Sequence, residues 1–309
     1  MLKDQDALNL LAKLSDQPEK SRSSYWNREL AHLDLKADGT MTGYSPQGNV
    51  SRKTGPLHSL AHWVLQTPFR SLGGRYRYFS DCQRLGRAVA RGQGRQYTSD
   101  MVRQSLALGL VREHISPADM DGVNVVIGDG YGVMTSLLRS AFPEKTVIAV
   151  NLKTPLLADL LFAREALTDK SLVLPRNPQE LAEAIAAPNP NIIGLMADDA
   201  HLLGDVPVAL AINIHSMQEM PVSVVADYFR FLRSNPASKT AFYCCNRVYK
   251  KLVGGEELRF DDFPWQGGDD VLVDEICPWD HIEYGPTPPF WRKNANQTRH
   301  RLAYLEKDV

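Results

Sequence analysis

The sequence predicts an α/β protein with a doubly wound, mostly parallel sheet behind a mainly helical N-terminal region. From residue 123 onward, short apolar runs alternate with segments whose apolar residues recur at helical spacing. Such alternation is typical of a parallel sheet that helices cover on both faces. The first apolar run also ends in a glycine-rich turn that opens the next helix, as ligand-binding sheets of this class do.

The elements of the sheet follow from these runs. We expect buried strands at 123–128, 146–151, 191–196, 208–213 and 240–245. We expect helices between them at 133–142, 156–167 and 177–187. Together they place a Rossmann-like domain at 118–309.

The preceding region, 1–117, reads as mainly helical, with a role in acceptor binding or oligomerisation. Near its start, Leu8, Leu11 and Leu14 fall on one face of an amphipathic helix. Helical spacing recurs at 57–66 and at 99–115, where Ser99 is the expected cap. The segment 38–56, rich in Gly, Ser, Thr and Pro, predicts a long loop or hairpin.

Composition restricts the class of protein. The chain has 309 residues, of which 43% are hydrophobic and 23% charged, which excludes a disordered or coiled-coil chain. No apolar run approaches the ~18 residues of a membrane helix, and the N-terminus lacks the apolar core of a signal peptide. The four cysteines form no C-x-x-C pair. We therefore expect a cytoplasmic protein with reduced thiols and no membrane partner.

Charge is distributed unevenly along the chain. Residues 22–112 hold 14 Lys and Arg against 5 Asp and Glu, whereas residues 254–309 hold 6 against 12. The basic segment suits an acidic substrate, such as a phosphorylated or nucleotide-linked compound, or is a solvated helical face. Its cations are scattered and form no nucleic-acid-binding motif, so we expect no nucleic-acid partner.

The glycine-rich turn is Gly128-Asp129-Gly130-Tyr131-Gly132, between the first predicted strand and helix. Glycines there let the backbone turn tightly and approach a ligand. Val133 stands where the dinucleotide fingerprint needs its third glycine, and no Lys-Ser/Thr follows as in a P-loop. The G-x-G-x-G spacing resembles motif I of S-adenosylmethionine-dependent methyltransferases. We therefore assign Gly128, Asp129, Gly130 and Tyr131 to cofactor binding.

The second strand ends at Asn151, about 20 residues beyond the loop. In nucleoside-binding folds an acidic residue near that place accepts hydrogen bonds from the ribose hydroxyls. Asn151 both accepts and donates but carries no charge. Asp198, after the third strand, is expected to contact the adenine or to be a turn residue.

A longer resemblance follows the fourth strand. Asn213 and the run Ser216-Met217-Gln218-Glu219-Met220 resemble the signature of the sugar O-methyltransferase family, as do FYCCNRVYK (242–250), GGEELRF (254–260) and DDFPWQGGDD (261–270). The resemblance spans about 123–275. It implies a class I methyltransferase-like fold, S-adenosylmethionine as cofactor with Asn213 beside it, and transfer of a methyl group to a hydroxyl of a sugar or glycosylated small metabolite.

His215 is the first candidate for the base, since it follows the fourth strand at the mouth of the expected cleft. Methyl transfer to a hydroxyl needs an aligned oxygen and a group that takes its proton, and a neutral histidine does this near pH 7. Glu219 is the second candidate, or orients His215. The alternatives are a structural loop histidine and a helix-capping box at Ser216-x-x-Glu219. His201 and His281 are rival bases.

For the acceptor, Asn246, Arg247 and Trp265 are the candidate contacts. We expect no metal site; Mg²⁺ held by Asp269 and Asp270 is an alternative that the sequence does not favour. Two other functions stay open, an NAD-dependent oxidoreductase and a non-catalytic adenosyl-binding or scaffold protein. A homo-oligomer is compatible with the sequence.

Overall fold

A nine-stranded sheet forms the centre of the molecule. The computed structural model describes residues 1–31, 33–43, 55–167, 171–189, 191–285 and 287–308. From edge to edge the strands are β1 (Leu2–Lys3), β6 (Leu172–Leu174), β7 (Ile192–Met196), β5 (Val147–Asn151), β4 (Val123–Ile127), β8 (Val208–Ile214), β9 (Ala241–Arg247), β15 (Thr298–Tyr304) and β12 (Asp270–Ile276). The strands from β6 to β9 are parallel, whereas β1 and β15 run antiparallel to their neighbours.

The strand order identifies the fold. Without the edge strands β1 and β6, the remaining seven strands, numbered along the chain, lie in the order 3-2-1-4-5-7-6 with the seventh antiparallel. This is the doubly wound sheet of the class I methyltransferase fold. The chain reverses direction across the sheet between β4 and β8, and ligands of such sheets bind at that switch point, beyond the carboxyl ends of the strands. The predicted fold class is confirmed.

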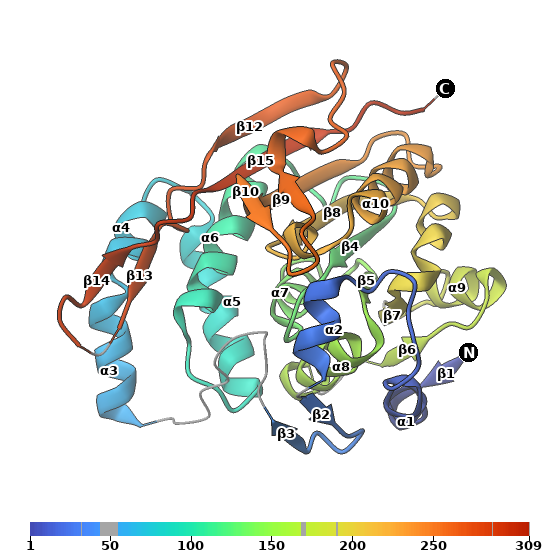
Figure 1. Cartoon of the computed structure of the whole chain (residues 1–309), viewed down its shortest axis with the longest axis horizontal. Helices are drawn as coiled ribbons and strands as arrows, with labels where there is room; N and C mark the ends of the chain where they lie inside the picture. The colour runs from blue at the N-terminus through green and yellow to red at the C-terminus, as the bar shows by residue number, and fades with distance from the viewer. Residues whose placement is uncertain (32, 44–54, 168–170, 190, 286, 309) are drawn as a thin grey trace.

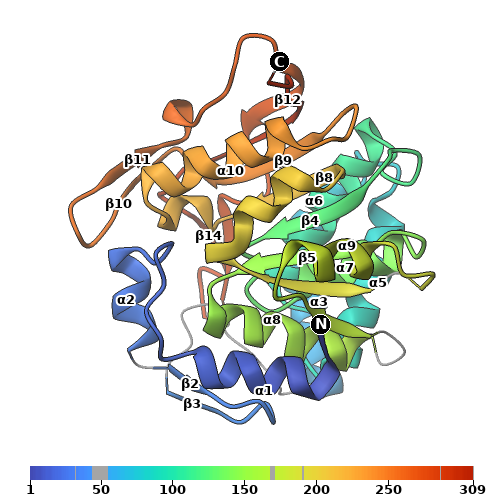
Figure 2. The same ribbon diagram turned by 90° about the vertical axis from the view of Figure 1, so that its right-hand side faces the viewer.

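Helices cover both faces of the sheet (Figures 1 and 2). One layer contains α1 (Asp4–Leu14), α5 (Phe79–Gly92), α6 (Ser99–His114), α7 (Val133–Ala141) and α8 (Lys153–Ala166). The other contains α9 (Pro178–Ile185), the 3₁₀ segment η1 (Ala197–Asp205) and α10 (Val222–Ser234). Because helices pack on both faces, the central strands are apolar at nearly every position, which is why single apolar runs predicted them.

Shorter elements surround this body. The remaining helical segments are α2 (Ser24–Leu30), α3 (Pro56–Leu65), α4 (Thr67–Gly73), η2 (Met217–Glu219) and η3 (Phe260–Asp262). Three antiparallel pairs join β2 (Leu33–Leu35) to β3 (Met41–Gly43), β10 (Tyr249–Lys251) to β11 (Glu257–Arg259), and β13 (Ile282–Tyr284) to β14 (Trp291–Lys293). The segment 38–56 is predicted as a loop or hairpin, and its start lies in the β2–β3 hairpin. Residues 44–54 of this segment lie outside the described part of the chain.

The N-terminus takes part in the main sheet. β1 pairs with β6, and α1 buries Leu8 and Leu11 against α8, with Leu14 half-buried. The amphipathic helix is therefore confirmed, and the division of the chain at residue 117 stays a prediction. Thr98, not Ser99, is the residue before α6, and no side chain caps this helix.

Two further properties concern burial. All four cysteines are buried and none forms a disulfide. Among the described residues, no helix combines the length and the apolar character that crossing a membrane needs.

Candidate functional site

The glycine loop joins β4 to α7 in the conformation that its sequence requires. Gly128, Gly130 and Gly132 have φ of +70°, +97° and +60°, values that residues with a side chain rarely adopt. A Cβ at Gly128 would lie 2.2 Å from Ser216 Oγ. A Cβ at Gly132 would lie 2.3 Å from the carbonyl oxygen of Asp159 on α8. Gly128 therefore allows the turn after β8 to approach the loop closely, and Gly132 allows α8 to pack on the loop.

Asp129 accepts hydrogen bonds at the N-terminus of α7. The backbone N–H groups of Met134 and Thr135 donate to its carboxylate at 2.9 and 2.7 Å. Burial raises the pKa of Asp129, and these hydrogen bonds oppose the rise. The carboxylate thus satisfies helix-end donors while it lines the pocket described below.

His215 follows β8 and is held in an uncommon conformation. Its φ is +64°, and its backbone N–H donates to the carbonyl of Cys245 at 2.8 Å. A non-glycine residue with positive φ persists only where its surroundings fix it, and such residues gather at functional sites. Here the side chains of Asn213, Ser216 and Asn246 fix the turn through hydrogen bonds.

Those three side chains form a hydrogen-bonded network. Asn213 Nδ2 donates to the carbonyl of Ile127 and to Ser216 Oγ, and Asn213 Oδ1 accepts from Asn246 Nδ2 at 2.7 Å. Ser216 Oγ donates to the same Ile127 carbonyl at 2.9 Å. Asn213 and Asn246, predicted as cofactor and acceptor contacts, are fully buried and do not line the pocket. They hold the His215 turn against the glycine loop.

The predicted capping box at Ser216-x-x-Glu219 is wrong. The Ser216 hydroxyl bonds to Ile127 and does not cap η2, and α10 begins only after Pro221. The Glu219 carboxylate instead pairs with Lys250 Nζ at 2.8 Å. Burial raises the pKa of Glu219, and the Lys250 cation opposes this. Met217, from the same run, is fully buried in the core.

The partner of His215 is Asp280, from the loop between β12 and β13. His215 Nε2 lies 3.0 Å from Asp280 Oδ1, and Arg103 Nε lies 3.8 Å from the same oxygen. Burial opposes the charge on both groups, but the ion pair outweighs it: the pKa of His215 is raised, and that of Asp280 lies well below its usual range. Since Asp280 occupies Nε2, Nδ1 is the imidazole nitrogen that remains to accept a proton.

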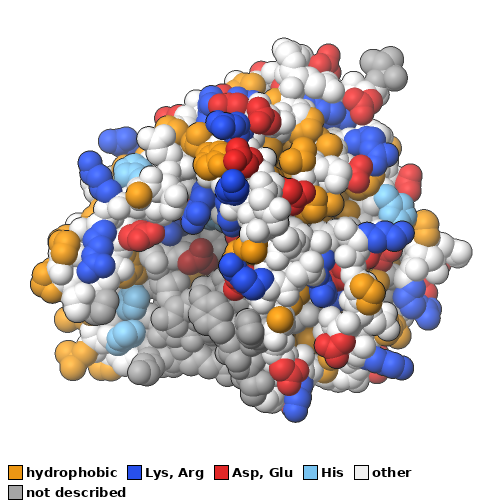
Figure 3. Space-filling model, viewed as in Figure 1, with side chains coloured by type: hydrophobic (Ala, Val, Ile, Leu, Met, Phe, Trp, Pro, Cys, Tyr) orange, Lys and Arg blue, Asp and Glu red, His pale blue; other side chains and the backbone are white. Residues whose placement is uncertain are grey.

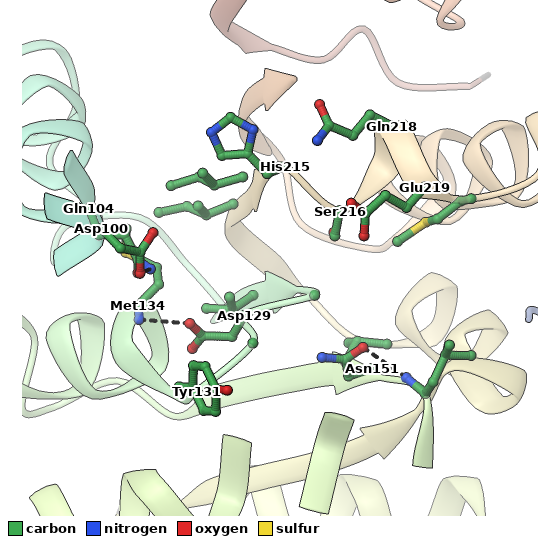
Figure 4. Close-up of a pocket in the computed structure, with 18 of the residues that line it drawn as sticks. Asp100, Gln104, Asp129, Tyr131, Met134, Asn151, His215, Ser216, Gln218 and Glu219 are labelled. Atoms are coloured by element: carbon green, nitrogen blue, oxygen red, sulfur yellow. Dashed lines mark hydrogen bonds between the residues drawn. The ribbon is translucent and has the colours of Figure 1, made fainter. Parts of the chain in front are cut away.

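These groups surround one pocket of about 470 Å³ at the carboxyl ends of β4, β5 and β8. Figure 3 shows this side of the molecule hollowed left of centre, with acidic side chains inside the hollow. Figure 4 shows Asp129, Tyr131 and Asn151 along one side and His215, Gln218 and Glu219 along the other. The predicted site residues that line it are Gly128, Asp129, Gly130, Tyr131, Asn151, His215, Glu219 and Arg247.

Two other predicted site residues lie elsewhere. Asp198, expected near the adenine, accepts hydrogen bonds from the backbone N–H groups of Lys20 and Ser21 at 3.1 and 3.0 Å, and from the Ser21 hydroxyl. Trp265, expected at the acceptor, packs in an aromatic cluster with Phe229 and Phe242 on the α10 side of the sheet. The rival bases His201 and His281 are not among the lining residues.

Comparisons with known proteins find likeness at the level of the fold. No protein-family model and no curated protein matches the sequence. The similar solved structures include magnesium protoporphyrin IX methyltransferase from Synechocystis PCC 6803 with bound S-adenosylmethionine, at 12% identity over 67% of this chain and 82% of that chain, with a TM-score of 0.42. Another is a methyltransferase dependent on S-adenosylmethionine from Anabaena variabilis, at 14% identity over 66% and 85%, with a TM-score of 0.41. The sheet order given above, rather than these overall likenesses, identifies the fold.

No metal centre is found in the described part of the chain. Three or more His, Cys, Asp or Glu side chains gather nowhere in it as metal ligands would. Asp269, one of the two carboxylates considered for Mg²⁺, instead accepts from both terminal nitrogens of Arg233, at 2.6 and 2.9 Å. Although burial opposes it, this pairing lowers the pKa of Asp269.

The structure adds lining residues that sequence reasoning missed. Asp280 comes from a segment without a recognised motif, and Asp100 and Gln104 come from α6 in the N-terminal region. Gln104 Nε2 donates to Asp100 Oδ2 at 3.2 Å, and Gln104 Oε1 is buried without a partner among the described residues. These two residues are one turn apart on a predicted helix, so the sequence predicts that they are neighbours but not that they line a pocket.

Proposed function

We propose that this chain is an S-adenosylmethionine-dependent O-methyltransferase whose acceptor is a sugar or a glycosylated small metabolite. The observation that carries the proposal is that one pocket at the switch point of the sheet holds both the glycine loop and the His215–Asp280 pair. The first suits an adenosyl cofactor, and the second suits removal of a proton from a hydroxyl.

The lining residues fit such a cofactor. The volume is within the ~300–1,000 Å³ of small-molecule sites. Gly128 and Gly130 bring bare backbone to the cavity, and Asn151 offers a donor and an acceptor for ribose hydroxyls. Asp100 and Gln104 Oε1, which has no partner in the described part of the chain, supply acceptors for an ammonium group. When bound, S-adenosylmethionine supplies an electrophilic methyl group on a cationic sulfonium, which a lining richer in carboxylates than in cations favours.

His215 is the residue that we assign to proton removal. The Asp280 carboxylate orients the imidazole and stabilises the imidazolium that forms after His215 Nδ1 takes the proton of the acceptor hydroxyl. Glu219 is less suited to this role because Lys250 already engages its carboxylate. The raised pKa makes His215 a stronger base and requires a pH above that pKa for activity.

The acceptor class rests on the sequence resemblance, and the other side of the pocket is compatible with it. Arg247, Gln218, Glu283 and Asn294 offer hydrogen-bonding groups there, and Trp26 offers a ring for stacking. The polar groups suit the hydroxyls of a sugar, and the ring suits its apolar face.

The experiment has two steps. Calorimetric titration with S-adenosylhomocysteine, with NAD⁺ as the comparison ligand, is expected to give micromolar binding of the first alone. Transfer of a labelled methyl group is then measured over a panel of sugars and glycosides. With an accepted substrate, His215→Ala is expected to lower kcat by about 10²-fold or more and leave S-adenosylhomocysteine binding within about threefold.

Other results would separate the alternatives. Binding of NAD⁺ instead would favour the oxidoreductase. Binding of S-adenosylhomocysteine without methyl transfer to any acceptor would favour the scaffold protein. Normal turnover by His215→Ala would remove His215 from the mechanism.

A further inference from the structure

The Asn151 side chain is held by a buried carboxylate that lies behind it. Asn151 Nδ2 donates to Asp159 Oδ2 at 2.8 Å, and Asn151 Oδ1 accepts from the backbone N–H of Leu152 at 2.9 Å. Asp159, on α8, is 1% exposed, and its other oxygen accepts from the Gly132 N–H at 3.2 Å. Because Asp159 accepts a hydrogen bond from this side chain and the Leu152 N–H donates one to it, the orientation of the Asn151 amide is fixed.

This arrangement leaves a defined pair of groups for the pocket. An amide nitrogen has two hydrogens and an amide oxygen has two lone pairs, and the structure uses one of each. Among the described residues, one N–H and one lone pair of Asn151 therefore remain without a partner, on neighbouring atoms of a residue that lines the pocket. Two adjacent hydroxyls, as in a ribose, are the natural complement, because one accepts while the other donates.

We propose that Asp159 is a positioning residue that orients Asn151 to bind the ribose diol of an adenosyl ligand. The inference rests on the proposed cofactor class and deepens it. The carboxyl group that other nucleoside-binding sheets place at the strand end lies one step back in this chain, on α8, and acts on the ligand through the amide of Asn151.

The same geometry explains why an acid is unsuited to position 151. A carboxyl group there would lie at the present hydrogen-bond distance from Asp159, so the two groups could not both be ionised. Burial, together with the charge of Asp129, already raises the pKa of Asp159 well above its ordinary value. A third carboxylate in this cluster would add a further like charge.

The decisive test exchanges the two residues. Asn151→Asp alone, which restores the usual acid, is expected to weaken adenosine binding about tenfold or more. In Asn151→Asp/Asp159→Asn, the amide now on α8 donates to the carboxylate now at the end of β5 and still accepts from Gly132, so all three hydrogen bonds return with one reversed. This double variant is expected to bind adenosine within about threefold of wild type. Asn177→Asp, the same change at the cap of α9, is the control for added charge.

A second readout separates positioning from support of the fold. Calorimetry compares adenosine with 2′,3′-dideoxyadenosine, which lacks the diol. Wild type is expected to prefer adenosine by about tenfold, and Asp159→Ala to reduce the preference to about twofold. If Asp159→Ala does not fold, Asp159→Leu, which fills the volume without accepting a hydrogen bond, replaces it.

Three outcomes would overturn the inference while the proposed function stands: Asn151→Asp binds adenosine as well as wild type does, the exchanged pair binds no better than Asn151→Asp, or Asp159→Ala weakens both nucleosides equally. If the wild-type chain binds neither adenosine nor S-adenosylhomocysteine, the proposed function fails first, and this inference fails with it.

Discussion

The two sides of the pocket are built in different ways. The side that we assign to the adenosyl part of the cofactor is local, since the glycine loop, Asp129 and Asn151 belong to one β4–α7–β5 unit. The side that we assign to the acceptor is assembled from a distance: His215 follows β8, Asp280 precedes β13, and Arg103 comes from α6. The first is therefore specified by backbone conformation within one turn, and the second by tertiary packing of segments that share no sequence motif.

The largest expected effect is at the local side, at Gly132. Gly132→Ala would place a methyl group 2.3 Å from a backbone oxygen of α8, at a φ of +60°. Neither the loop nor the helix relaxes cheaply, so the free energy of unfolding should fall by about 3 kcal/mol or more, with loss of S-adenosylhomocysteine binding. Denaturant unfolding and calorimetry measure the two effects.

Gly255→Ala is the matched control for this substitution. Gly255 also has a positive φ, of +93°, but an added Cβ there would meet nothing within 4 Å. It should cost only about 1 kcal/mol, which is the conformational term alone. If the two variants lose equal stability, the close approach of α8 does not matter and the cofactor side is less tightly specified than we argue.

The next effect concerns the acceptor side and the long-range pair. Asp280→Asn keeps a hydrogen-bonding group beside His215 but removes the charge that raises the pKa of the imidazole. That pKa should fall, and methyl transfer should slow by roughly 10²-fold because the imidazolium loses its counter-charge. NMR titration of the His215 ring measures the pKa, and His215→Gln identifies its signal.

The sign of the pH dependence follows from the same shift. Below its pKa, His215 is protonated and unable to take a proton, so activity should rise with pH through that raised pKa in the wild type. In Asp280→Asn the rise should move to lower pH while the maximum falls. An unchanged pH profile would mean that His215 is not the group that titrates in catalysis.

This comparison explains what the sequence could predict. The sheet strands were predictable because burial on both faces makes them continuous apolar runs, and the glycine loop because its backbone requires Gly128 and Gly132. β6, β12 and β15 were not predicted. β6 has three residues, β12 mixes exposed polar side chains into a strand at the sheet edge, and β15 beside it contains buried or half-buried polar residues.

Site residues after a buried strand were harder to assign. Polar side chains at such places face either a ligand or the neighbouring turn, and the sequence does not distinguish the two. His215 and Arg247 line the pocket, whereas Asn213 and Asn246 bond to backbone and to each other beneath it. Asp280 was missed because its proximity to His215 arises only when the loop after β12 folds over the end of β8.

The smallest expected effect tests where the local side of the pocket ends. Asp198 was expected to bind the adenine, but its carboxylate fastens the segment around Lys20 and Ser21, which brings Ser21 and Trp26 to the pocket. Asp198→Ala should therefore free this segment and speed tryptic cleavage after Lys20 and Arg22 about tenfold. S-adenosylhomocysteine binding should weaken by no more than about threefold, since only exposed hydrogen bonds are lost. A tenfold loss of binding with unchanged proteolysis would mean that Asp198 contacts the cofactor after all. The cofactor side of the pocket would then include a residue that follows β7, beyond the β4–α7–β5 unit.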